Sequence, residues 1–467
     1  MIISMKHILS YIFMFIFFNT AVFGKIILPS VFSDNMVLQQ NSKVTIWGWS
    51  NPSETVRIVA SWNNNDTIVA KANNSSYWKT SIQTGVAGGP FTLKIFGSTN
   101  VELKNVKLGE VWICSGQSNM EMTVKWGIKD GEEEARKANN PNIHIFHIEK
   151  IGAEFPQLTC NATWTESTTE TMRSTSSLAY FFGRELQQKL NVPIGIIVSA
   201  WGGTPAEVWI EKNRIENNPM LNKYKYNEHY DWWPDSPGAL YNSMIAPIIP
   251  YSVAGVIWYQ GEANRNNYQI YSLLMKTLIE NWRKDFNQEL PFYLVQIAPF
   301  NYRDKGNSQF VREQQEMVTK SLPKTGMVVV SDLVNDINDI HPKDKLSVGK
   351  RLANFALAEV YHQNTGEYKS PTFQNMRIER NKVFLTFNNA FGLKCVGEKP
   401  EKFMISGADK NFIKANAKIK GNTIILFSKE IKDPLAIRFC FNDTTRADVF
   451  NSAGLPMAPF RTDNWEK

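Results

Sequence analysis

The sequence predicts an α/β protein in which a parallel sheet, sandwiched by helices, is flanked by a β-sandwich-like region at each end of the chain. Short runs rich in β-branched and aromatic residues, separated by Gly, Asn and Pro turns, fill the stretches before about residue 107 and after about residue 369. Between them, apolar strands alternate with segments of helical periodicity. Strands that are apolar throughout are typical of a parallel sheet covered on both faces.

The first 24 residues are predicted to be a signal peptide rather than part of the fold. Lys6 precedes a run from residue 8 to residue 18 that is apolar except for Ser10, and small residues such as Val22 and Gly24 follow it. This run is about half as long as the roughly 20 residues that a membrane span requires, so cleavage is favoured over a single N-terminal anchor. We therefore expect a secreted or periplasmic protein that has no membrane attachment once residues 1–24 are removed.

Two β regions are expected, at residues 25–107 and 366–467. Asn-Pro, Asn-Asn and Gly-Gly-Pro turns separate the strands of the first region, and strands return after about residue 369. The predicted strands are residues 44–47, 56–59 and 91–95 in the first region, and 382–387 and 423–427 in the second.

The central α/β domain is expected at residues 108–365. Apolar residues recur at helical spacing from Leu178 to Leu190 and again from Leu274 to Trp282. The predicted strands are residues 111–114, 194–198, 253–259, 292–297 and 327–330. Ligands of such a sheet bind at the carboxyl ends of its strands, so the residues just after each strand are the candidates for chemistry.

Composition excludes several classes of protein. Of 467 residues, 43% are apolar and 20% charged, as in ordinary globular proteins. The net charge of +7 is modest, and no run of five Lys or Arg occurs, so a nucleic-acid binder is not expected. Four cysteines are too few for a disulfide scaffold or a zinc ribbon, and the His-Glu-x-x-His zinc motif is absent. His144 and His147, three apart on an apparent strand, point to opposite faces, which disfavours a shared metal.

Export would permit disulfides. Cys395 and Cys440 lie in the same late region and could pair, as could Cys114 and Cys160, but spacing does not fix the connectivity.

A serine follows the first strand of the central domain. Ser118 lies in the peptide at residues 115–120, where a glycine allows a tight turn after the strand at 111–114. Such a turn can present a hydroxyl at the rim of the sheet and aim backbone N–H groups at a developing oxyanion. The alternative is a turn serine that caps the following helix.

Two further strand ends carry hydrogen-bond donors. Gly202 and Gly203 follow the strand at 194–198, and paired glycines expose backbone N–H groups, although a plain turn explains them equally well. Gln260 and Asn264 follow the strand at 253–259. Their amides are neutral donors that suit an oxyanion, and the alternative is a polar cap of the loop.

His341 favours a catalytic interpretation of these loops. It follows the strand at 327–330, and Pro342 suits the first turn of a helix, which predicts His341 at the N-cap. A lone histidine is usually structural. Here it lies beside carboxylates on the same predicted sheet edge as Ser118, and a serine early with a histidine late is the order expected of a Ser–His hydrolase on an α/β sheet.

A series of peptides along nearly the whole chain after residue 24 makes the sequence recognisable. They are residues 32–39, 47–49, 109–112, 115–120, 202–204, 258–262, 339–342, 454–456 and 459–463. In content and order they resemble those of the sialate O-acetylesterase family, within the SGNH (GDSL-like) hydrolases. The resemblance implies an SGNH-type sheet, both β regions as parts of the family architecture, and an enzyme that removes O-acetyl groups from carbohydrates.

The resemblance also implies roles for individual residues. Ser118 would be the nucleophile and His341 the general base. The oxyanion hole would combine the Ser118 N–H, a glycine of the 202–203 pair such as Gly203, and Gln260 or Asn264. This chemistry requires neither a metal nor an organic cofactor, and none is expected.

The acid that orients the histidine departs from the family pattern. SGNH hydrolases commonly place it three residues before the histidine, where this chain has Asn338. Asp339, two residues before His341, is expected instead, and Asp336, Asp332 or a Ser–His pair without an acid are the alternatives. The physical requirement is a group that accepts from the distal ring N–H and fixes the tautomer.

Two other functions fit parts of the same sequence. A retaining glycosidase needs two carboxyls about 5–5.5 Å apart, which Glu262 and Asp339 could supply, but it leaves Ser118 and the glycine pair without a role. A non-catalytic carbohydrate-binding protein on the same scaffold is the alternative of a different class. Exposed tryptophans at residues 126, 232 and 233 could stack on sugar rings or serve packing.

We therefore expect a serine esterase whose partner is an acetylated carbohydrate. The sequence leaves open which sugar it acts on and what its oligomeric state is.

Overall fold

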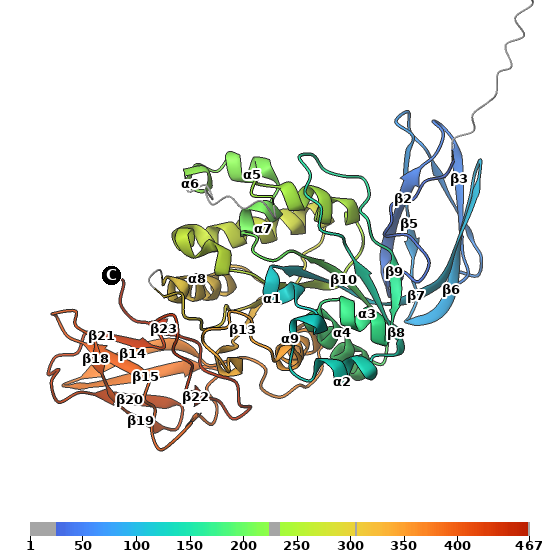
Figure 1. Ribbon diagram of the computed structural model, residues 1–467. Coiled ribbons are helices and arrows are strands. Elements are labelled where there is room, and N and C mark those ends of the chain that lie inside the picture. The colour runs from blue at the N-terminus through green and yellow to red at the C-terminus, as the bar shows by residue number, and fades with distance from the viewer. Residues whose placement is uncertain (1–24, 224–233, 304–305, 466–467) are drawn as a thin grey trace, which may run out of the picture.

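The computed structural model describes residues 25–223, 234–303 and 306–465 (Figure 1). The predicted signal peptide at residues 1–24 lies outside this range, as do the tryptophans at positions 232 and 233. In the described part of the chain, no helix has both the length and the apolar character needed to cross a membrane.

The α/β prediction is confirmed by the central sheet. Its strands lie in the order β13-β12-β11-β7-β10-β8-β9. Their bounds are β7 Asn100–Gly116, β8 Asn140–His147, β9 Trp164–Ser167, β10 Ile194–Ala200, β11 Gly255–Tyr259, β12 Phe292–Val295 and β13 Thr325–Val328. All neighbours pair in parallel except β9, which is antiparallel to β8. The carboxyl ends of β7, β10 and β11 therefore meet at one edge.

Helices cover both faces of this sheet (Figure 1). Helices α4 (Ser177–Leu190) and α9 (Lys345–Glu359) pack on one face, and α7 (Tyr271–Phe286) and α8 (Ser308–Ser321) on the other. A hydrophobic core lies on each face of the sheet, and successive residues of β7 point into opposite cores. Ile113 packs in the core that contains α7, and Trp112 packs in the core that contains α4 and α9. This explains why the strands are apolar at every position.

The remaining helical segments of the central domain are short. They are α1 Ser118–Glu121, η1 Val124–Trp126, α2 Gly131–Arg136, α3 Thr169–Ser174, η2 Ala206–Trp209, α5 Lys212–Glu216, α6 Pro219–Lys223, η3 Tyr241–Ile245, η4 Ala246–Ile248, η5 Glu262–Ile270 and η6 Ser331–Leu333.

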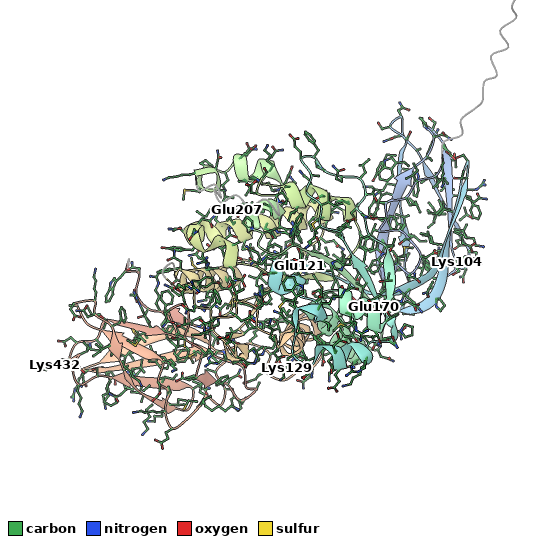
Figure 2. All side chains as sticks on the ribbon, viewed as in Figure 1. Lys104, Glu121, Lys129, Glu170, Glu207 and Lys432 are labelled. Atoms are coloured by element: carbon green, nitrogen blue, oxygen red, sulfur yellow. The ribbon has the colours of Figure 1, made fainter. Side chains whose placement is uncertain are left out.

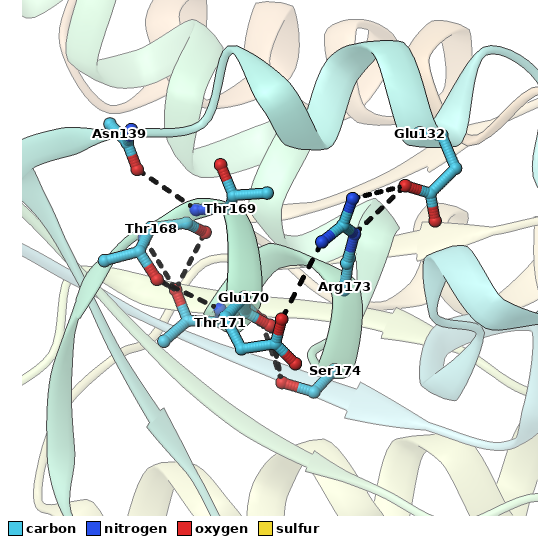
Figure 3. Close-up of polar contacts among 8 residues, drawn as sticks. All are labelled: Glu132, Asn139, Thr168, Thr169, Glu170, Thr171, Arg173 and Ser174. Carbon is cyan, nitrogen blue, oxygen red and sulfur yellow. Dashed lines mark hydrogen bonds and ion pairs between the residues drawn. The ribbon is translucent and has the colours of Figure 1, made fainter.

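Local side-chain hydrogen bonds and an ion pair hold the short helices α2 and α3 in place (Figure 3). Thr168 caps α3, because its Oγ1 accepts from the Thr171 N–H while Thr171 Oγ1 accepts from the Thr168 N–H. Arg173 at the end of α3 donates from Nε (3.0 Å) and Nη2 (2.8 Å) to Glu132 of α2. Both helices contact η1, the turn that carries Trp126.

The first β region is continuous with the central sheet. Its strands are β1 Val37–Gln39, β2 Lys43–Trp49, β3 Thr55–Ala60, β4 Thr67–Lys71, β5 Tyr77–Gln83 and β6 Gly88–Phe96. Strand β2 pairs with β5, and β3, β4 and β6 form a second layer that ends on the first half of β7. The second half of β7 pairs with β10 and β11. The boundary predicted between residues 107 and 108 thus falls inside one strand.

The second β region has its own core between two four-stranded sheets. One sheet contains β14 Thr372–Glu379, β15 Lys382–Asn388, β20 Thr423–Phe427 and β19 Asn416–Lys420. The other contains β18 Ile413–Lys414, β17 Phe403–Ser406, β21 Ala436–Phe439 and β23 Phe460–Arg461, and β16 Lys394–Cys395 pairs with β22 Val449–Phe450.

Polar contacts join the second β region to the central domain. The Arg461 guanidinium donates to both carboxylate oxygens of Glu313 on α8, at 2.7 and 2.9 Å. Arg446 donates to the Val334 carbonyl at 2.7 Å, in the loop that leads to His341. Figure 2 labels side chains of all three regions: Lys104 in the first β region, Glu121 and Glu207 among those of the central domain, and Lys432 in the second β region.

All four cysteines are free thiols, so neither of the possible disulfide pairs is formed. Cys114 is buried in β7 and Cys440 in the second β region.

Candidate active site

Ser118 lies at the sheet edge because β7 ends in a turn that only glycine permits. Gly116 has a φ of +139°, and a Cβ added there would lie 2.2 Å from the Tyr259 carbonyl oxygen of β11. The Gln117 N–H donates to the same carbonyl at 2.9 Å, and Ser118 then begins α1. The turn directs the start of α1 over the carboxyl ends of β7 and β11.

His341 meets Ser118 from the loop after β13. Its Nε2 lies 2.9 Å from Ser118 Oγ, across 223 residues of sequence. The predicted helix start at Pro342 is wrong: α9 begins at Lys345, and Asp344 is its N-cap, accepting from the Ser347 N–H at 2.9 Å. His341 is therefore a loop residue, held just before the helix.

The surroundings of His341 favour the neutral imidazole. Burial is the largest cause that lowers the pKa of His341, and the positive charges of Lys345 and Lys343 lower it further. The negative charges of Asp339 and Glu121 act in the opposite direction and raise this pKa. A neutral ring can accept the proton of the Ser118 hydroxyl through Nε2.

Asp339 lies close to His341 but does not bond to the ring. Its Oδ1 is 3.8 Å from Nδ1 and accepts instead from the His341 backbone N–H at 2.9 Å. Its Oδ2 lies 3.1 Å from Lys343 Nζ. Although burial opposes the shift, the bond from the His341 N–H and the Lys343 ammonium lower the pKa of Asp339. The side chain is thus an ionised carboxylate that fixes the loop backbone.

The other acid candidates bond elsewhere. Asp332 forms a two-point ion pair with Arg351, at 2.8 and 2.6 Å, and Asp336 accepts from the Asn338 N–H at 2.8 Å. Across residues 25–223, 234–303 and 306–465, no other carboxylate approaches a ring nitrogen of His341 as closely as Asp339.

Two backbone donors are available near the hydroxyl. In the described chain, no group accepts from the Ser118 or the Gly203 N–H. Gly202, between Gly203 and the end of β10, lies against Ser118, because a Cβ added to it would come 3.2 Å from Ser118 Cβ. The Gly202 N–H is itself occupied, donating to Glu121 at 2.6 Å.

Gln260 and Asn264 are not brought to the oxyanion position. Gln260 Nε2 donates to the Thr204 carbonyl (3.2 Å) and to Asn264 Oδ1 (2.7 Å). Asn264 Nδ2 donates to Glu207 (2.8 Å) and to Asn267 (3.2 Å). Both side chains are fully buried, and these contacts use every hydrogen of the two amides. In this structure they stabilise the loop that follows Gly202 and Gly203, because Gln260 donates to the Thr204 carbonyl and Asn264 Oδ1 accepts from the Ala206 N–H.

Comparison with known proteins identifies the family. Residues 108–358 match the family described as "Carbohydrate esterase, sialic acid-specific acetylesterase". The chain belongs to this family of acetylesterases.

Relatives of this esterase match it over most of its length. It is 30% identical to human sialate O-acetylesterase in an alignment of 396 positions that covers 76% of this chain and 75% of the human one. It is 27% identical to the mouse sialate O-acetylesterase over 450 residues, covering 80% and 83% of the two chains. The crystal structure of a carbohydrate acetylesterase from Xanthomonas citri superposes with a TM-score of 0.86 at 32% identity, covering 94% of this chain and 100% of that one. The shared fold extends through both β regions.

A buried polar cluster of the esterase was not predicted from sequence. Asn119, Glu262 and Lys345 are fully or almost fully buried behind the Ser118–His341 pair. Asn119 lies in the peptide at residues 115–120 that carries the family resemblance, and its place next to Ser118 was therefore a sequence signal for a role at this site. Nothing in the sequence around Lys345 distinguishes it from a surface lysine.

The described chain contains no group of three or more His, Cys, Asp or Glu side chains arranged to hold a metal ion. His144 and His147 do diverge: His144 is buried and bonds to the Asn35 and Pro141 carbonyls, whereas His147 is exposed.

Proposed function

We propose that this esterase releases acetate from O-acetylated carbohydrates through an acetyl-enzyme on Ser118, with His341 as the general base. The contact of 2.9 Å between Ser118 Oγ and His341 Nε2 carries the proposal. A serine hydroxyl is a weak nucleophile until a base within hydrogen-bond reach takes its proton. The lowered pKa of His341 favours the form of the ring that accepts it.

The reaction runs in two halves. Ser118 Oγ attacks the acetyl carbonyl carbon as its proton passes to Nε2, and the tetrahedral oxyanion accepts hydrogen bonds from the Ser118 and Gly203 N–H groups. The C–O bond to the sugar then breaks, and the sugar oxygen takes the proton from Nε2. Water, activated by the same nitrogen, attacks the acetyl-enzyme and releases acetate and Ser118.

We propose that His341 acts without a directly bonded acid. At 3.8 Å from Nδ1, the Asp339 carboxylate supports the imidazolium through its charge, and through the backbone bond that fixes the loop. A charge at this distance stabilises a cation less than a hydrogen-bonded carboxylate does. The unit is therefore a Ser118–His341 pair with Asp339 as a supporting charge.

The sugar is expected on the side of Ser118 that His341 occupies, because the departing oxygen must reach Nε2. Trp126 lies there, 39% exposed, with its ring centroid 5.6 Å from that of His341. An exposed indole offers an apolar face on which a pyranose ring can lie. We propose Trp126 as the platform for the sugar next to the ester.

O-acetylated sialic acid is the first substrate to test, since the human and mouse relatives are named for it. Acetate release from acetylated sialic acid, acetylated xylan and other acetylated glycans should be measured side by side with purified protein. Labelling of Ser118 by a serine-directed phosphonate, read by mass spectrometry, separates an esterase from a carbohydrate-binding protein. An unlabelled, inactive protein on all substrates would overturn the proposal.

A further inference from the structure

The buried cluster of Asn119, Glu262 and Lys345 joins three segments behind the site. Asn119 follows Ser118 on α1, Glu262 begins η5 after β11, and Lys345 begins α9. Asn119 is 0% exposed, Glu262 5% and Lys345 1%. None of the three is assigned a role in the reaction described above.

Asn119 is the centre of this cluster. Its Nδ2 donates to Glu262 Oε1 at 2.8 Å and to the Ile340 carbonyl at 3.1 Å, and its Oδ1 accepts from Lys345 Nζ at 2.7 Å. Both amide hydrogens are thus used. Because Ile340 immediately precedes His341, the amide ties the residue after the nucleophile to the residue before the base.

Burying the ionisable groups of Glu262 and Lys345 on either side of Asn119 costs free energy of folding. A buried ammonium or carboxylate loses its hydration, which apolar residues of similar size would avoid. In the described chain, Glu262 Oε2 has no hydrogen-bond partner. Burial lowers the pKa of Lys345 to about 7 and raises that of Glu262. A cluster maintained against such a cost is better explained by a role in positioning than by stability.

His341 needs positioning from its backbone. Among the residues that the structure describes, no carboxylate bonds to its ring, so the direction of Nε2 depends on how the 339–341 backbone is held. Two side chains bond to it: the Ile340 carbonyl accepts from Asn119, and the His341 N–H donates to Asp339. Within the loop itself, the Asp339 N–H donates to the Asp336 carbonyl at 3.3 Å. A displacement of about 1 Å between reacting groups can reduce the rate about a hundredfold.

We propose that Asn119, held between Lys345 and Glu262, is a positioning residue that sets His341 against Ser118. The inference rests on the proposed Ser118–His341 chemistry. Lys345 adds an electrostatic contribution, because its charge, with that of Lys343, opposes protonation of His341, whereas Asp339 and Glu121 favour it. These four groups and burial set the pH at which the base becomes available.

Asn119→Ala tests the positioning role, and Asn281→Ala is its matched control. Asn281 is equally buried, lies on α7, and accepts from the Glu211 N–H at 2.8 Å, away from the pair. We expect Asn119→Ala to lower kcat for acetate release at least about tenfold with KM changed less than about threefold. Asn281→Ala should lose thermal stability but keep kcat within about twofold. Equal kcat values for the two variants would overturn the proposal.

A second pair of variants keeps the test valid if Asn119→Ala does not fold. Lys345→Met removes the charge and the bond to Asn119, whereas Lys345→Arg retains both. We expect Lys345→Met to lose at least about tenfold in kcat, and the midpoint of the acid limb of kcat/KM to move to higher pH. Lys345→Arg should remain within about threefold of wild type. Equal kcat and an unmoved midpoint in Lys345→Met would contradict the inference.

The outcome also distinguishes this inference from the proposed function. A wild-type protein that releases no acetate refutes the function itself. An active wild type that Ser118→Ala inactivates, together with a fully active Asn119→Ala, refutes only the positioning role.

Discussion

His341 Nδ1 and Asp339 Oδ1 lie 3.8 Å apart, too far for a hydrogen bond, although the two residues are joined through the His341 N–H. The Asp339 carboxylate therefore acts on the backbone that carries His341 more directly than on the imidazole ring. A carboxylate bonded to the ring would both fix the loop and stabilise the imidazolium. Because Asp339 bonds to the backbone and not to the ring, substitutions can measure these two effects separately.

Asp339→Asn should lower kcat about three- to tenfold with little change in KM. The asparagine retains an oxygen that can accept from the His341 N–H, so only the charge is lost. Steady-state kinetics of Asp339→Asn, Asp336→Asn and Asp332→Asn should be compared. Asp332→Asn should mainly lower thermal stability, because it weakens the ion pair with Arg351. A loss of more than about a hundredfold for Asp339→Asn would instead show that Asp339 bonds to the ring during turnover.

Ser118→Ala should lower acetate release by at least about a thousandfold, because the variant has no nucleophile. Ser115→Ala is the control, since Ser115 lies in the same peptide but is buried in β7, and its Oγ has no hydrogen-bond partner among the described residues. Both proteins should show the wild-type circular dichroism spectrum. More than about a tenth of wild-type turnover in Ser118→Ala would remove Ser118 from the mechanism.

Activity should rise with pH as His341 loses its proton. Because burial and the two lysines lower the pKa of His341, the midpoint of the kcat/KM profile is expected below the ordinary value of about 6.5. Lys343→Gln removes a positive charge and should move the midpoint up, whereas Asp339→Asn removes a negative charge and should move it down. Shifts in the same direction for both variants would identify another titrating group.

Trp126→Ala should raise KM for an acetylated sugar about tenfold while kcat changes little, and Trp126→Phe should recover part of the loss. Phe391→Ala removes a 69% exposed aromatic ring from the second β region and should be neutral. A small acetate ester without a sugar should be hydrolysed equally by all three variants and wild type. A tenfold loss on that ester would indicate that Trp126 supports His341 rather than the sugar.

Periodicity predicted five parallel strands of the central sheet (β7, β10, β11, β12 and β13) and the helices α4 and α7, because strands buried on both faces and amphipathic helices leave strong patterns. The sequence predicted only residues 111–114 of β7, because these are the residues with the apolar pattern of a buried strand, whereas pairing with β6 extends the strand back to Asn100. The helix start was also misplaced, because Asp344 makes a side-chain cap that outweighs the preference of Pro342 for a first turn.

The recognised peptides led to Ser118 and His341, but the directions of side-chain amides cannot be inferred from sequence. Gln260 and Asn264 follow strand β11, as expected, yet their amide hydrogens are donated to buried acceptors and do not point to Ser118. Lys345 reaches Asn119 across 226 residues, and only the packing of α9 behind α1 brings them together. Such contacts depend on tertiary structure rather than on any local pattern.

Strand β7 passes without a break from the first β region into the sheet that presents Ser118. Because side chains alternate along a strand, adding or deleting one residue between positions 100 and 116 would exchange the two faces of the strand downstream, or shift Ser118 by about 3.4 Å along the strand. We therefore expect changes of chain length to be tolerated in the hairpins of the first β region but not in this strand. For protein engineering, we therefore expect that exchanging the N-terminal β region at a junction at residue 107 would disrupt the site, since the junction would cut the strand that positions Ser118.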